Sequence, residues 1–143
     1  MKEENILNLN IQLPDKETKT LKEIIPDIIK GHTEKMIFTA QIIANYIARE
    51  LPKKERLYPY QIRRVLGTIK RIEIEGFDSK KLLLLKPQLV FIASKNDSTL
   101  GIQYLRDILI ESIDRVGEHE DYFRYFMDFF EAILAYYQAI EKD

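Results

Sequence analysis

The chain has 143 residues, and its 22 basic and 23 acidic side chains leave a net charge of −1. That length predicts one domain with a core of its own, and the absence of cysteine excludes disulfides, thiol nucleophiles and cysteine-based zinc sites. The five glycines and five prolines, together with abundant Leu, Ile, Glu, Lys and Ala, favour a helical fold.

Charge is sorted along the chain. Residues 53–95 carry eleven basic and four acidic side chains, whereas residues 96–143 carry four basic and eleven acidic ones. A basic segment of this kind is typical of proteins that neutralise phosphate groups. The near-neutral total therefore conceals a candidate polyanion-binding segment.

No segment predicts a signal peptide or a membrane span. The start of the chain is charged, and the most apolar stretch, residues 82–93, is short and interrupted by Lys86 and Pro87. We expect a soluble, cytoplasmic protein without a membrane partner.

The first twenty residues are polar. Residues 7–13 alternate between apolar and polar side chains in the manner of a strand. No other segment offers a partner strand, and one strand cannot satisfy its own backbone groups. We therefore expect residues 1–20 to be a flexible N-terminal arm and residues 21–143 to form a single helical domain.

Helical periodicity runs through the rest of the chain. In a short first segment, Thr20 and Glu23 predict a capping box, Pro26 predicts a kink or restart, and Gly31 predicts the end. Longer helical segments are expected over residues 33–51, 59–73, 79–94, 101–116 and 120–140. Together they predict an all-α fold, a compact bundle of about five helices.

The segment 59–73 is the clearest amphipathic helix, and Pro59 suits its first position. Its apolar stripe consists of Ile62, Val65, Leu66, Ile69 and Ile72. Its opposite face consists of Arg63, Arg64, Gly67, Lys70 and Arg71. These cations have no acid at a spacing of four before Glu75, and the glycine would let another backbone approach. An ordinary solvated face is the alternative, but the missing counter-charge favours a binding surface.

Two later segments are strongly apolar. Residues 82–93 are apolar all round, which predicts the central element of the bundle, with Pro87 breaking or restarting the helix. The segment 120–140 holds eight of the fifteen aromatic residues. Its stripe is expected to serve the core and protein contacts: Tyr122, Phe123, Phe126, Phe129, Phe130, Ile133, Leu134, Tyr137 and Ile140.

No catalytic arrangement is visible. His32 and His119 have no serine or cysteine in a nucleophile motif, and no glycine-rich loop that could hold a phosphate follows a strand. The adjacent His119, Glu120 and Asp121 would point in different directions, so we interpret them as an acidic helix start rather than a metal site. We expect no catalytic residue, no metal, no cofactor and no enzymatic activity.

Three motifs resemble a known family. They are Tyr-Pro-Tyr-Gln-Ile-Arg-Arg at 58–64, Leu-Lys-Pro-Gln-Leu-Val-Phe-Ile-Ala at 85–93 and Tyr-Phe-Met-Asp-Phe-Phe-Glu-Ala-Ile-Leu-Ala-Tyr-Tyr at 125–137. In order and spacing they resemble the small subunit of the type III-A CRISPR effector, the Csm complex, from about Leu57 to the C-terminus. The family usually has Thr or Ser before Gln-Ile-Arg, where this chain has Tyr58, Pro59 and Tyr60. A proline start can replace the hydroxyl cap.

The resemblance implies a compact helical protein without catalytic activity, present in several copies along an antiviral effector. Its implied partners are CRISPR RNA, target single-stranded RNA, other Csm subunits and copies of itself. The motifs carry over RNA contacts to Gln61, Arg63, Arg64 and Lys86. The basic segment itself adds Lys70, Arg71 and Lys95.

Two alternatives remain open at this point. The protein could be a helical adaptor whose basic and acidic ends dock against each other in a homo-oligomer, without touching nucleic acid. It could also be a small hydrolase with an unrecognised site.

Overall fold

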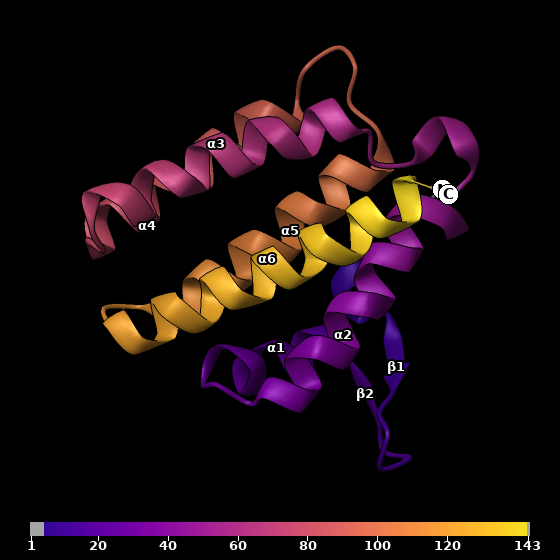
Figure 1. The fold of residues 1–143 in the computed structure, drawn as a ribbon, viewed down its shortest axis with the longest axis horizontal. Helices are drawn as coiled ribbons and strands as arrows, with labels where there is room; N and C mark the ends of the chain where they lie inside the picture. Colours follow the sequence, from indigo (N-terminus) through magenta and orange to yellow (C-terminus); the bar gives the residue numbers. More distant parts are fainter. Residues whose placement is uncertain (1–4, 143) are drawn as a thin grey trace.

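The computed structural model describes residues 5–142, which form six α-helices preceded by a short hairpin (Figure 1). The helices are α1 (Leu21–Ile29), α2 (Thr33–Asn45), α3 (Pro59–Glu75), α4 (Ser79–Ala93), α5 (Leu100–Val116) and α6 (Glu120–Glu141). The prediction of an all-α fold is confirmed, with six helices rather than about five. The difference lies in the short first segment, because α1 continues through Pro26 and both bonds of the Thr20–Glu23 capping box are present.

The N-terminal segment is packed, not detached. Strand β1 (Asn10–Gln12) pairs antiparallel with β2 (Thr18–Thr20), placing Ile11 opposite Lys19. Ile6, Ile11 and Leu13 are buried in the main core. The expectation of an arm without a partner strand was therefore wrong for residues 5–20, because the partner is a polar Thr-Lys-Thr segment that sequence periodicity does not mark. Residues 1–4, where that arm begins, lie outside the described residues.

Three short turns complete the backbone. A π-helical turn, Tyr46–Glu50, extends α2 towards Pro52, and 3₁₀ turns cover Ile6–Asn8 and Lys53–Glu55. The predicted helix over 33–51 is thus an α-helix that ends at Asn45 and continues as a wider turn.

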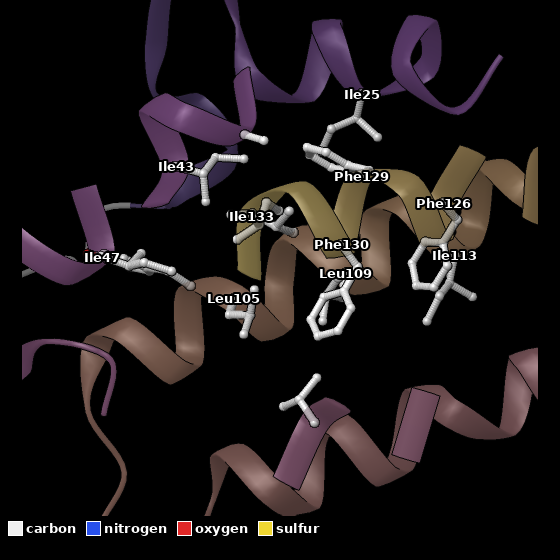
Figure 2. Close-up of a cluster of buried hydrophobic side chains, with 14 of the residues drawn as sticks. Ile25, Ile43, Ile47, Leu105, Leu109, Ile113, Phe126, Phe129, Phe130 and Ile133 are labelled. Carbon is white, nitrogen blue, oxygen red and sulfur yellow. The ribbon is translucent and has the colours of Figure 1, made fainter. Parts of the chain in front are cut away.

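The helices form three layers. Helices α5 and α6 run side by side through the middle, with α1 and α2 packed on one side and the α3–α4 hairpin on the other (Figure 1). Figure 2 shows Phe126 and Phe130 pointing towards Ile113 and Leu109 of α5, and Phe129 pointing towards Ile25 of α1. The predicted aromatic core is confirmed for six members of the α6 stripe, which are buried: Phe123, Phe126, Phe129, Phe130, Ile133 and Tyr137.

Helix α4 is not the central element that its composition predicts. It lies in an outer layer and buries only Leu82, Leu85, Leu89 and Ala93, while the apolar side chains on its other side remain exposed. Pro87 lies inside the helix without ending it. That prediction was wrong because composition alone does not distinguish a helix that is covered on all sides from one that leaves an apolar side exposed.

Tyr137 joins α6 to the segment that leads into α3. Its side chain is buried, and its hydroxyl donates a 2.7 Å hydrogen bond to the carbonyl oxygen of Leu57. Burial raises the pKa of the Tyr137 phenol well above its usual range.

We expect Tyr137→Phe to lower the free energy of unfolding by about 1 to 2 kcal/mol, because the Leu57 carbonyl loses its buried donor. Urea unfolding followed by circular dichroism measures the change. The matched control is Tyr122→Phe, since the Tyr122 hydroxyl has no hydrogen-bond partner among residues 5–142. An equal effect of the two variants would contradict this role.

Candidate nucleic-acid interface

Helix α3 is held by its predicted apolar stripe, of which Ile62, Val65, Ile69 and Ile72 are buried. Pro59 occupies the first turn, and the side-chain oxygen of Gln61 accepts a 2.8 Å hydrogen bond from the backbone N–H of Tyr58. The start of the helix is therefore capped without a serine or threonine.

The outer face of α3 carries two exposed arginines. Arg63, Gly67 and Arg71 recur at intervals of four residues and are all exposed, and we refer to them as the arginine stripe. Neither arginine has an ion pair or hydrogen bond within residues 5–142. The two lie about 12 Å apart along the helix axis.

Gly67 leaves the space between these arginines open. A methyl group built on Gly67 would have no neighbour within 4 Å, so no other part of the described chain approaches the backbone here. The stripe thus presents one cation on each side of an uncovered stretch of helix backbone. This arrangement suits contact with successive phosphates of a nucleic-acid strand.

The other two cations of the predicted face are paired. Arg64 lies 3.3 Å from the carboxylate of Asp97 and stacks over the Tyr60 ring at 5.1 Å. Lys70 lies 2.9 Å from both Glu131 and Glu73, and these carboxylates raise the pKa of the lysine, with Glu131 contributing most. The expectation that this face lacks counter-charge was therefore wrong for Arg64 and Lys70. Asp97 and Glu131 are distant in sequence and come close only in the fold.

Gln61 faces inwards. It is 1% exposed, and its amide nitrogen donates a 2.9 Å hydrogen bond to the backbone carbonyl of Asp97 while its oxygen accepts from Tyr58. The side chain joins the start of α3 to the loop between α4 and α5. In this conformation the buried Gln61 side chain is not accessible to RNA.

Lys86 and Lys95 lie away from the arginine stripe. Lys86 forms a 2.6 Å ion pair with Asp114 of α5, so it points towards the middle layer. The Lys95 ammonium sits over the ring of Phe91, 4.5 Å from its centre. The seven residues singled out in the sequence therefore do not share one face.

A groove runs beside the arginine stripe, between the start of α3 and the end of α6. Pro59, Arg63, Gln138 and Lys142 line it, together with the carboxylate-bearing Glu141. Sequence reasoning missed Gln138 and Lys142, because only the fold brings the end of α6 beside α3. Arg63 and Lys142 give this groove two cations against one acid.

The described part of the chain, residues 5–142, contains no group of three or more His, Asp or Glu side chains that could hold a metal ion. Within the same residues, no helix combines the length and hydrophobicity that crossing a bilayer requires.

Comparison with known proteins gives one match. The model of the Csm2 Type III-A family matches residues 34–143, about three quarters of the chain, and so begins upstream of the motifs noted in the sequence. No curated protein and no solved structure matches the chain. The family match confirms the resemblance, and the chain belongs to the Csm2 family, the small subunits of type III-A CRISPR Csm complexes.

Proposed function

We propose that this protein is a non-catalytic RNA-binding small subunit that contacts the sugar-phosphate backbone of CRISPR RNA and target RNA through α3. The observation that carries the proposal is the arginine stripe: Arg63 and Arg71 are exposed and unpaired within residues 5–142, on either side of the open Gly67. Unpaired cations on a rigid helix attract phosphate without first having to break an internal ion pair.

The contact would be independent of sequence. Guanidinium groups bind phosphate oxygens in a two-pronged geometry, and phosphate contacts carry no base information. The base pairing of the guide RNA would then supply specificity, while this subunit holds the strand. Arg64 and Lys70 contribute less, because phosphate must compete with Asp97, Glu73 and Glu131 for them.

The proposal also covers the complex to which the protein belongs and the compartment in which that complex acts. As a member of its family the chain takes its place in a Csm complex with other subunits. We further place the complex in the cytoplasm, with several copies of this chain along the RNA and no catalytic step performed by it.

We expect the purified protein to bind unrelated single-stranded RNAs with similar affinity, as measured by fluorescence anisotropy. Two free contacts predict a log–log salt slope of about −1.4, whereas four would give about −3. Arg63→Glu with Arg71→Glu should lower the affinity about tenfold or more for every sequence at low salt. The RNA should be recovered intact after incubation with Mg²⁺.

The matched control is Lys22→Glu with Lys30→Glu, two exposed positions on and just after α1. Both double variants lower the net charge equally, so a difference between them reports position rather than total charge. Circular dichroism establishes that each variant is folded. Equal affinities of the wild type and the folded Arg63/Arg71 variant would favour the alternative, a helical adaptor without nucleic-acid contact.

A further inference from the structure

Two tyrosine rings form a stacked pair at the start of α3, and we call this pair the tyrosine platform. The ring centres of Tyr58 and Tyr60 are 5.8 Å apart, and the ring planes are within 7° of parallel. Both residues are half-buried, so part of the platform remains accessible to solvent. The other stacked pair within residues 5–142, Phe123 and Phe126, is buried in the core. An accessible pair of this kind is a candidate contact for a flat ligand.

The tyrosine platform is fixed by its neighbours. The Gln61 side chain accepts a 2.8 Å hydrogen bond from the backbone N–H of Tyr58 and donates a 2.9 Å hydrogen bond to the carbonyl of Asp97. The Arg64 guanidinium lies over the Tyr60 ring, 5.1 Å from its centre, and pairs with the Asp97 carboxylate at 3.3 Å. Because the rings are held before a ligand arrives, binding loses little side-chain entropy.

The charge at the platform differs from that of the arginine stripe. Arg64 and Asp97 largely neutralise each other, so the rings lie beside an ion pair rather than an unpaired cation. Partial burial and the nearby Asp97 carboxylate raise the pKa of the Tyr60 phenol, so this ring is uncharged at neutral pH. A neutral, flat group such as a nucleobase therefore suits the platform better than a phosphate does.

Tyr60 lies on the same side of α3 as the arginine stripe. Gly67 and Arg71 follow Tyr60 by seven and eleven residues, which is close to two and three turns of the helix. Arg63 follows Tyr60 by three residues, so their positions differ by only about 5 Å along the axis. Sites for single-stranded nucleic acid combine cations that follow the backbone with aromatic rings on which bases stack. The start of α3 offers both within one turn.

We propose that the tyrosine platform stacks against an unpaired base of the RNA strand whose phosphates contact the arginine stripe. The inference rests on the proposed function and adds a base contact to the backbone contact. Every base has a π-face, so this stacking tolerates any sequence. It requires a base that is not enclosed in a double helix, which directs the platform to single-stranded stretches.

Fluorescence anisotropy with two strands of equal length tests the proposal. One strand is a single-stranded RNA, and the other is its abasic counterpart, which keeps the ribose and phosphate groups but lacks the bases. We expect the wild type to bind the RNA roughly five- to hundredfold more tightly than the abasic strand at low salt. Tyr58→Leu with Tyr60→Leu should lower the RNA affinity towards that of the abasic strand and leave the abasic affinity unchanged.

Two controls separate stacking from other effects. Tyr58→Phe with Tyr60→Phe keeps both rings and should bind like the wild type. Phe91→Leu removes a ring that is 64% exposed on α4, away from the platform, and should also bind like the wild type. Circular dichroism establishes that each variant is folded. Irradiation of RNA that contains 5-iodouridine should crosslink the base to Tyr58 or Tyr60, as identified by mass spectrometry.

The two strands also distinguish the possible failures. Equal affinities of the wild type for RNA and for the abasic strand would overturn the platform and leave the backbone contact standing, and this comparison does not depend on the folding of any variant. Crosslinks confined to residues outside 58–60 would overturn it as well. No binding of the abasic strand would instead contradict the backbone contact, whereas RNA binding that disappears in the folded leucine variant would still support the platform.

Discussion

Phe130→Ala is expected to lower the free energy of unfolding by about 3 to 5 kcal/mol, because truncating a buried phenylalanine removes its apolar contacts and leaves a cavity. Phe130 is fully buried, and its ring points from α6 towards Leu109 of α5 (Figure 2). Since α5 and α6 form the middle layer, a cavity here lies between both outer layers. A domain of this size is stable by only about 5 to 15 kcal/mol, so the loss should be visible as a large drop in thermal midpoint.

Phe91→Ala provides the matched comparison. It removes the same ring from a residue that is largely exposed on α4, and surface substitutions usually change stability by about 0.5 kcal/mol or less. Urea unfolding of the two variants, with equal slopes against denaturant, gives the difference directly. Similar stability of both variants would mean that Phe130 is not packed in the middle layer.

Amphipathic periodicity was enough to predict the helices that bury one side. In α3 the spacing of Ile62, Val65, Ile69 and Ile72 identified the inward face, and the opposite face followed from geometry. The same holds for α6, where the ring positions alone separated the buried side from the solvent side. These features are local, so they can be predicted from the sequence without knowledge of the fold.

Features that depend on contacts between distant segments were not predictable. The partner of β1 is a polar segment without a strand pattern, and the outer position of α4 cannot be distinguished from a central one by composition. Both misreadings have one cause: periodicity reports which faces are apolar but not what covers them.

In the candidate site, too, local features could be predicted from the sequence and contacts between distant segments could not. That α3 presents cations followed from its spacing, but which of them are free depends on acids elsewhere. Asp97 and Glu131 neutralise Arg64 and Lys70, and leave Arg63 and Arg71 without an internal partner among the described residues. Gln61 was assigned to RNA because of its motif, whereas its hydrogen bonds give it a structural role at the start of α3.

Gly101→Ala is expected to cost roughly 3 kcal/mol or more, at the upper end of the range for inserting a methyl group into a packed site. A Cβ atom on Gly101 would clash with the backbone of Arg56 and Leu57, most closely with the Leu57 nitrogen. That backbone cannot easily retreat, because Leu57 donates to the carbonyl of Ile47 at 2.9 Å and accepts from Tyr137 at 2.7 Å. The added methyl group must therefore displace α5 or break these bonds.

Gly67→Ala is the control for the same substitution at an open position. No neighbour lies within 4 Å of its new methyl group, and alanine in a helix interior is about 0.5 to 1 kcal/mol more favourable than glycine, so the free energy of unfolding should rise by about this amount. The two glycine variants should thus move the urea midpoint in opposite directions. If Gly101→Ala left the midpoint unchanged or raised it, the close crossing of the Arg56–Leu57 backbone over the start of α5 would be refuted, and with it the packing that holds the beginning of α3 in place.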